Sequence, residues 1–215
     1  MAAEADDRAP PLPPAAQPIV GVLLAAGRGR RFDATGTQSK LLQALPSGCT
    51  VAETAALNLR AGLDRVIAVV RPGEPPLADL LAACGCQVIT HRQADRGMGS
   101  SIACAVQAST DAGGWVIALA DMPAVTPTTI EKVAAALRAG ATAAVPLHQG
   151  RRGHPVGFAA RWREALAALD GDLGARALLA QARPLSIEVD DAGCLLDLDT
   201  PADLAALAAP AATRR

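Results

Sequence analysis

The chain has 215 residues, of which 51% are hydrophobic and 2% aromatic, and its formal net charge at pH 7 is −1. A chain of this length and hydrophobicity can bury a core of its own and fits one domain better than two. The near-neutral charge and the absence of tyrosine argue against nucleic acid as a partner, because an extended nucleic-acid surface needs a basic balance and rings for base stacking. A small anionic ligand is the better expectation.

The two ends of the chain are expected to be tails around a single domain. Residues 1–18 begin with acidic side chains and continue into a proline-rich run, and residues 209–215 are a short end that contains alanine, proline and two arginines, so the domain is predicted at 19–208. The start lacks the pattern of a signal peptide and no apolar run is long enough for a bilayer, so a cytoplasmic protein without membrane contact is expected. Five cysteines without a Cys-x-x-Cys pair predict neither a disulfide framework nor a zinc ribbon.

From residue 19 onward, short apolar runs alternate with longer alanine- and leucine-rich segments of helical period, which is typical of a mostly parallel sheet covered by helices. Strands are expected at residues 19–24, 65–70, 87–90, 115–120 and 142–145. Helices are expected at residues 51–61, 76–84, 100–109, 127–138, 161–169, 174–182 and 201–208. Two helix starts carry clear signals, a capping box of Thr50 with Glu53 and an N-cap at Thr126 before Pro127.

One connection, residues 25–49, is about four times longer than the usual loop between a strand and its helix. It leaves the carboxyl end of a central strand, where open α/β sheets bind their ligands. Its run Gly27-Arg28-Gly29-Arg30-Arg31-Phe32 lacks the third glycine of a dinucleotide fingerprint, and Ser39 before Lys40 breaks the P-loop pattern. The glycines, arginines and lysine are suited to a triphosphate, although an exposed basic loop is the alternative.

Two aspartates are candidate metal ligands. Asp121 directly follows the strand expected at 115–120, so its carboxylate should emerge beside bound phosphates and could hold Mg²⁺; an Asx turn is the alternative. Asp199 shares a face with Asp197 in an alternating run before Thr200-Pro201. It could be a second metal ligand, or it could stabilise the helix that starts there through the helix dipole.

Two further polar loops precede predicted elements. The loop Gly97-Met98-Gly99-Ser100-Ser101 offers a flexible backbone and hydroxyls for a base or a ribose, or serves only to start a helix. The loop Gly150-Arg151-Arg152-Gly153-His154-Pro155 leads into an apolar segment at 156–158. His154 by itself is more often a structural residue, but the two arginines beside it indicate an acidic acceptor.

Six ordered motifs between about Ile19 and Leu207 resemble those of the MobA-like nucleotidyltransferases, and within them the molybdenum cofactor cytidylyltransferases, which join CMP to molybdopterin. The motifs are Leu24-Ala25-Ala26-Gly27-x-Gly29-x-Arg31 with Lys40-Leu41-Leu42, Gly97-Met98-Gly99-x-Ser101-Ile102, Ala120-Asp121-Met122-Pro123, Gly153-His154-Pro155-Val156-x-Phe158, Gly171-Asp172-x-Gly174-Ala175-Arg176 and Asp197-x-Asp199-Thr200-Pro201-x-Asp203. The double alanine before Gly27 resembles the cytidylyl branch, whereas the guanylyl branch tends to carry a second glycine there.

The resemblance implies a Rossmann-like, three-layer α/β fold with a mostly parallel central sheet. It also implies a Mg²⁺-dependent enzyme that transfers CMP from CTP to the terminal phosphate of molybdopterin and releases pyrophosphate. Catalytic roles would fall to Arg31, Lys40 and Asp121, with Mg²⁺ held by Asp121 and Asp199. Nucleotide contacts are expected at Ala25, Ala26, Gly27, Gly29, Arg31, Lys40, Gly97, Gly99, Ser100 and Ser101, and acceptor contacts at His154, Pro155, Asp172 and Arg176.

Three alternatives stay open at this stage. The first is the same chemistry with GTP or with another phosphorylated acceptor. The second is a non-catalytic accessory protein that binds the cofactor for a client molybdoenzyme, and the third, suggested only by the alternating pattern, is an NAD(P)-dependent oxidoreductase. The segment 32–39 is longer than the short glycine-rich link of the family, which leaves open whether Lys40 reaches the phosphates.

Overall fold

The structure, a computed structural model, describes residues 17–33, 38–172 and 174–208. The tails expected at 1–18 and 209–215 lie outside the described residues, apart from residues 17 and 18. No helix in the described part of the chain is long and apolar enough to cross a membrane.

An eight-stranded sheet runs through the centre of the molecule, in the order β3-β2-β1-β4-β7-β5-β6 with β8 paired to β5. The strands are β1 (Ile19–Ala25), β2 (Arg65–Val70), β3 (Gln87–Thr90), β4 (Gly114–Leu119), β5 (Ala143–His148), β6 (Arg151–Arg152), β7 (Val156–Ala159) and β8 (Leu185–Glu188). Strands β2 and β4 flank β1 and run parallel to it, whereas β7 runs antiparallel to β4 and β5. The mostly parallel sheet that the sequence predicts is therefore confirmed.

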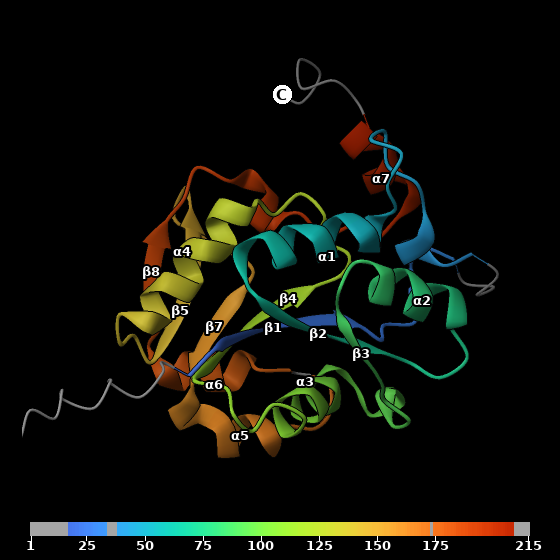
Figure 1. Cartoon of the computed structure of the whole chain (residues 1–215). Helices are drawn as coiled ribbons and strands as arrows, with labels where there is room; N and C mark the ends of the chain where they lie inside the picture. The colour runs from blue at the N-terminus through green and yellow to red at the C-terminus, as the bar shows by residue number, and fades with distance from the viewer. Residues whose placement is uncertain (1–16, 34–37, 173, 209–215) are drawn as a thin grey trace, which may run out of the picture.

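Helices cover both faces of the sheet and complete three layers (Figure 1). One face carries α1 (Val51–Gly62), α2 (Pro75–Ala83) and α4 (Pro127–Arg138), and the other carries α3 (Met98–Gln107), α5 (Arg163–Ala167) and α6 (Arg176–Ala182). Helix α7 (Pro201–Ala208) packs Leu204 and Leu207 against the core of the first face. Short 3-10 turns are η1 (Lys40–Leu42), η2 (Ala94–Arg96), η3 (Ala160–Trp162) and η4 (Ala192–Leu195).

Each face of the sheet has its own buried core. Leu59 and Ile130 pack in the core on the α1/α4 face, and Ile102 and Leu166 pack in the core on the α3/α5 face. Strands β1, β2 and β4 contribute to both cores because successive side chains point to opposite faces. This two-sided burial explains why these strands are near-continuous apolar runs in the sequence.

Both predicted helix starts are confirmed. The Thr50 hydroxyl accepts a hydrogen bond from Glu53 N at 3.2 Å while the Glu53 carboxylate accepts one from Thr50 N at 3.0 Å, which completes the capping box of α1. At α4 the Thr126 hydroxyl accepts from Thr129 N at 3.4 Å.

A second group, the buried carboxylate of Asp191, also anchors the start of α4. Its Oδ2 accepts from Thr126 N at 3.0 Å, from the Thr126 hydroxyl at 2.9 Å and from the Thr129 hydroxyl at 2.6 Å, and its Oδ1 accepts from Gly193 N at 3.0 Å. Burial raises the pKa of this carboxyl, but the hydrogen bonds outweigh burial and hold the pKa below its ordinary value.

The arrangement of β1, β2 and β4 decides where a ligand can bind. The chain passes from β1 to β2 on one side of β1 and later returns to β4 on its other side, so the direction of winding reverses between β1 and β4. In the pairing register, Leu24 at the end of β1 lies opposite Leu119 at the end of β4. The crevice beyond the carboxyl ends of such strands is the usual ligand site of open α/β sheets.

Candidate active site

The centre of the site is an amine held between two carboxylates. Nζ of Lys40 donates to Oδ2 of Asp121 at 2.7 Å and to Oδ1 of Asp199 at 3.3 Å. The Lys40 side chain is only 10% exposed, and those of Asp121 and Asp199 are 24% and 20% exposed. A largely buried ammonium needs such partners, since burial without them would be costly.

Three distant segments deliver these groups to one point. Asp121 follows the carboxyl end of β4, and its carbonyl accepts from Leu198 N at 2.9 Å, which holds the segment carrying Asp199 beside the strand end. Lys40 begins η1, which is fixed by the buried Leu41 and by a 3.0 Å hydrogen bond from the Gln43 side chain to the Ser39 carbonyl. The long connection after β1 therefore brings Lys40 to the carboxylates rather than out into solvent.

Asp199 faces the site, and a different aspartate caps α7. Arg31 donates to Oδ2 of Asp199, although the Arg31 side chain is 78% exposed. The start of α7 is instead held by Asp203, whose carboxylate accepts from Thr200 N at 2.7 Å and from Asp199 N at 3.0 Å. Hydrogen bonds from Thr200 hold the pKa of Asp203 below its ordinary value. Of the two roles considered for Asp199, stabilising the helix start thus belongs to Asp203.

The two carboxylates fit a Mg²⁺ ion that binds together with a nucleotide. Asp121 and Asp199 turn oxygens toward the same point, and both are accessible enough to take a ligand. Within the described residues no group of three or more His, Cys, Asp or Glu side chains could hold a metal by itself. Two aspartates are a donor set of the kind that Mg²⁺ uses when phosphates and water complete its coordination.

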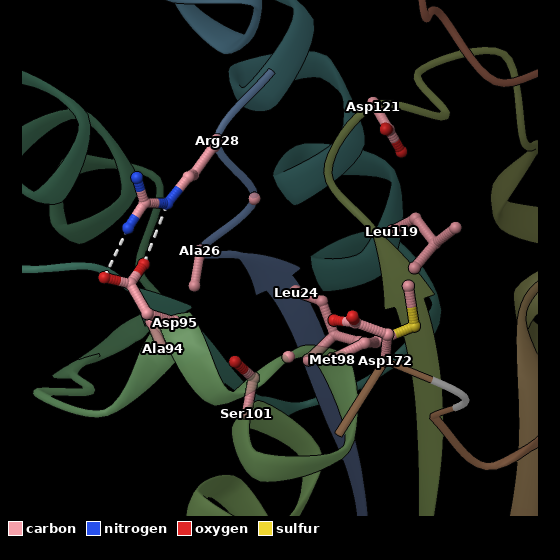
Figure 2. Close-up of a pocket in the computed structure, with 12 residues that line it drawn as sticks. Leu24, Ala26, Arg28, Ala94, Asp95, Met98, Ser101, Leu119, Asp121 and Asp172 are labelled. Carbon is pink, nitrogen blue, oxygen red and sulfur yellow. Dashed lines mark hydrogen bonds and ion pairs between the residues drawn. The ribbon is translucent and has the colours of Figure 1, made fainter. Parts of the chain in front are cut away.

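Two cavities flank this centre. The first, of about 330 Å³, lies between the carboxyl ends of β1 and β4 and the start of α3; its walls include Ala26, Gly97, Ser101 and Asp172 (Figure 2). The second, of about 260 Å³, lies between the loop after β1, η1 and the start of α2. Gly27, Arg28 and Asp121 line both cavities. Asp121 therefore stands where the two cavities meet, Lys40 lines the second, and Asp199 lines neither. Together the cavities offer space of the order expected for a small-molecule site.

An ion pair that the sequence did not indicate forms one wall of the first cavity. Arg28 donates through Nε to Oδ1 of Asp95 at 2.9 Å and pairs through its terminal nitrogen with Oδ2 (Figure 2). Arg71 binds the same carboxylate. Hydrogen bonds from Arg28 and Arg71 hold the pKa of Asp95 below its ordinary value. The pair joins the loop after β1 to η2, and no local pattern in the sequence could reveal a contact across 67 residues.

The predicted glycines before α3 have a packing role. Gly97 has φ of +107°, and a Cβ there would lie 2.4 Å from the Gly171 carbonyl carbon. At Gly99 a Cβ would lie 2.8 Å from the Asp170 carbonyl oxygen, and Gly99 N donates to Gly171 O at 2.8 Å. The glycines thus let the start of α3 approach the 170–172 loop, which places Asp172 on the same cavity wall as Gly97.

The two predicted serines face different ways. Ser101 lines the first cavity, as expected for a nucleotide contact. Ser100 instead lines a separate surface hollow; its hydroxyl donates to Gly97 O at 2.8 Å and lies 3.1 Å from Nε2 of His91. In this structure Ser100 holds the turn before α3 and does not line either cavity of the candidate site.

The predicted acceptor residues are also divided. Asp172 lines the first cavity, whereas Arg176 is exposed at the start of α6 and Pro155 is buried. His154 lies in a small enclosed space with Asn58 on the α1/α4 face, and burial lowers the pKa of its imidazole although Asp121 and Asp197 act to raise it. The structure thus brings Asp172, but not His154, Pro155 or Arg176, to the walls of the two cavities, and acceptor contacts by all four residues stay predictions.

Fold and site together define an α/β protein with candidate ligand cavities at the switch point of its sheet. Residues 21–185 match the MobA-like NTP transferase domain, so the chain belongs to that family of nucleotidyltransferases. The sequence-based resemblance to MobA-like nucleotidyltransferases is thereby confirmed.

Two known proteins, one of them with two solved structures, illustrate the similarity. The structure resembles Rv0371c of Mycobacterium tuberculosis H37Rv with a TM-score of 0.76 and 28% identity, over 89% of this chain and 97% of that one. The structure of Rv0371c in complex with manganese gives a TM-score of 0.71 at 27% identity, over 88% and 97% of the two chains. The nicotine blue oxidoreductase of Paenarthrobacter nicotinovorans is 28% identical over 180 residues, which cover 80% of this chain and 86% of that protein.

Proposed function

We propose that this nucleotidyltransferase uses Mg²⁺ to transfer CMP from CTP to the terminal phosphate of molybdopterin, releasing pyrophosphate. The observation that carries the proposal is the convergence of Lys40, Asp121 and Asp199 where two cavities meet at the switch point of the sheet. The manganese complex of Rv0371c supports a divalent cation in a related protein.

The residues of the centre suit a reaction in which charge moves between phosphates. An oxygen of the acceptor phosphate attacks the α-phosphorus in line; the new P–O bond forms as the bond to the bridging β-phosphate oxygen breaks, and pyrophosphate leaves with that electron pair. Lys40 and Arg31 would offset negative charge on the triphosphate and the departing pyrophosphate. Asp121 and Asp199 would hold the Mg²⁺, which supplies further charge neutralisation when bound. No protein nucleophile is required.

The cavities suggest how the substrates are divided. Gly27 and Gly29 lie in the loop beside Lys40, where backbone groups can approach the triphosphate; a Cβ at Gly27 would meet no protein atom within 4 Å. The first cavity, with Ala26, Gly97 and Ser101 in its walls, would take the nucleoside. Asp172, which lines that cavity beside Gly97, is the position from which an acceptor would be contacted.

The choice of CTP and molybdopterin rests on the six sequence motifs, in particular the Leu24-Ala25-Ala26-Gly27 form. The protein should be incubated with Mg²⁺, molybdopterin and each of the four nucleoside triphosphates, while pyrophosphate and product mass are measured. CTP is expected to give pyrophosphate and a CMP–molybdopterin product. Turnover with GTP alone, or with another phosphorylated acceptor alone, would establish the corresponding alternative.

A non-catalytic accessory role makes a different prediction. If the protein only binds the cofactor and passes it to a client molybdoenzyme, Asp121→Ala should bind ligand and support maturation of that enzyme as well as the wild type does. The proposed transfer reaction instead requires this variant to fail in maturation while it remains folded.

An oxidoreductase is a second candidate because of the name of the Paenarthrobacter relative. The loop after β1 does not support a dinucleotide site, since in its described residues, 26–33 and 38–50, it forms no α-helix before Val51. In a dinucleotide fold the glycine turn leads directly into that helix, whose N-terminus binds the pyrophosphate. Titration with NAD(P)H is expected to show no tight binding; tight binding would support the oxidoreductase.

A further inference from the structure

The hairpin of β5 and β6 stands at the edge of the sheet that holds the site. Since β7 runs antiparallel to both β4 and β5, β5 runs in the direction of β4, and its carboxyl end lies at the same edge as Asp121. Gln149 and Gly150, with φ of 48° and 75°, form the two-residue turn to β6. After β6 the chain is anchored by hydrogen bonds from Gly153 N to Pro146 O at 3.0 Å and from His154 N to Cys194 O at 2.8 Å.

The alternation along β5 identifies the two faces of this hairpin. Ala143 and Val145 pack in the core on the α3/α5 face, whereas Ala144 between them packs in the core on the α1/α4 face. Continued alternation places Leu147 on the α3/α5 face and His148 on the α1/α4 face.

The two arginines of β6 therefore point to opposite faces. Arg152 is paired with Leu147 and Arg151 with His148, and residues directly opposite each other in an antiparallel pair share a face. Arg152 thus lies on the α3/α5 face and Arg151 on the α1/α4 face. Both are exposed, and no ion pair or hydrogen bond engages either side chain within the part of the chain that the structure describes.

The α3/α5 face at this edge is the one that carries the first cavity. Gly97 and Ser101 line the cavity from the start of α3, and Asp172 lines it from the loop before α6. Among the described cavity-lining residues, Arg28 is the only arginine or lysine of the first cavity, and it is already paired with Asp95. An anionic acceptor that enters beside Asp121 and Asp172 would meet no unpaired arginine or lysine among the described residues that line this cavity.

We infer that Arg152 binds the terminal phosphate of the acceptor, and that Arg151 has no part in this contact. The identity of the acceptor rests on the proposed function, whereas the division between the two arginines rests on the pairing of β5 with β6. A guanidinium can bind two phosphate oxygens at once, which also orients the attacking oxygen. The sequence associates both arginines with an acidic acceptor. The pairing of β5 with β6 assigns the contact to Arg152 alone, so Arg151 serves as the control.

The test is a fluorescence titration of molybdopterin, without nucleotide, against the wild type, Arg152→Ala, Arg152→Lys and Arg151→Ala. Arg152→Ala is expected to raise the Kd at least tenfold, Arg152→Lys to restore part of the loss, and Arg151→Ala to stay within twofold of the wild type. Equal effects of the two alanine variants, or no effect of Arg152→Ala, would overturn the inference, as would failure of the wild type to bind.

A transfer assay on the same proteins separates this inference from the proposed function. If the wild type releases no pyrophosphate with CTP but Arg152→Ala alone weakens molybdopterin binding, the proposed transfer is wrong and the Arg152 contact stands. If the wild type transfers CMP and Arg152→Ala has an unchanged KM for molybdopterin, the Arg152 contact is wrong and the transfer stands.

Discussion

Nζ of Lys40 lies 2.7 Å from Oδ2 of Asp121, although 81 residues separate the two in the chain. With Asp199 at 3.3 Å on its other side, the ammonium is an internal counter-ion for two carboxylates that the proposal assigns to Mg²⁺. The same amine would bind phosphate oxygens once a nucleotide and its metal arrive. The proposal therefore gives Lys40 and Asp121 separable roles, one toward phosphate and one toward the metal.

Replacing Lys40 by Met should separate metal binding from turnover. Loss of the amine is expected to lower kcat/KM at least about 100-fold, because a charge-stabilising donor is removed. Mn²⁺ binding without nucleotide, followed by electron paramagnetic resonance, should be retained or tightened, since the carboxylates lose their competing cation. Asp121→Asn should lose both turnover and Mn²⁺ binding. Equal loss of Mn²⁺ binding in the two variants would show that Lys40 does not have a separate role.

Gly99 and Gly27 should respond differently to alanine. At Gly99 the new Cβ would lie 2.8 Å from the Asp170 carbonyl oxygen, so we expect overpacking to lower the free energy of unfolding by about 1–3 kcal/mol. At Gly27 a Cβ would meet no protein atom within 4 Å but would enter both cavities. Gly27→Ala should therefore leave the free energy of unfolding unchanged and lower the affinity for nucleotide. Urea unfolding measures the first effect and nucleotide titration the second. A Gly99→Ala protein with the free energy of unfolding of the wild type would contradict the close approach of the start of α3 to the 170–172 loop.

Asp191→Asn should weaken the start of α4 in a pH-dependent way. An amide cannot accept all the hydrogen bonds that this carboxylate accepts, and the expected loss at pH 7 is about 2 kcal/mol. Because the pKa of Asp191 is lower in the folded than in the unfolded protein, its contribution is complete above the unfolded value of about 3.9 and is lost as the pH falls toward the folded pKa. Unfolding of wild type and variant should therefore converge below about pH 4. Asp190→Asn, at an exposed neighbour, is the control; a constant difference at all pH values would contradict the account.

The regular part of the fold could be predicted because its signals are local. The apolar runs of β1, β2 and β4 and the caps of α1 and α4 lie within a few residues of the elements they define. Strand β8 was not predicted, since its side chains are mostly exposed and Leu185–Glu188 has neither a continuous apolar run nor a turn signal of its own. The helix expected at 161–169 is present but shorter, because the segment begins as the 3-10 turn η3 and is α-helical only in α5, Arg163–Ala167.

The site was predictable in its residue types but not in its pairings. Asp121 could be placed at the sheet edge from the sequence alone, because it follows β4 directly. The position of Lys40 depends on how η1 packs, and the Arg28–Asp95 pair depends on the approach of two loops, so neither is encoded in local spacing. Ser100 and Ser101 illustrate the same limit, since adjacent residues of one motif face different surfaces of α3.

An assay with phosphorus-labelled CTP tests the central claim, metal-dependent nucleotidyl transfer, most directly. The wild type and Asp121→Asn should be supplied with Mg²⁺, molybdopterin and CTP labelled at either the α- or the γ-phosphorus. We predict that the wild type places the α-label in the molybdopterin product and the γ-label in pyrophosphate, and that Asp121→Asn does neither. Release of the γ-label as inorganic phosphate without transfer of the α-label, or full transfer by Asp121→Asn, would contradict metal-dependent nucleotidyl transfer at the Lys40–Asp121–Asp199 centre.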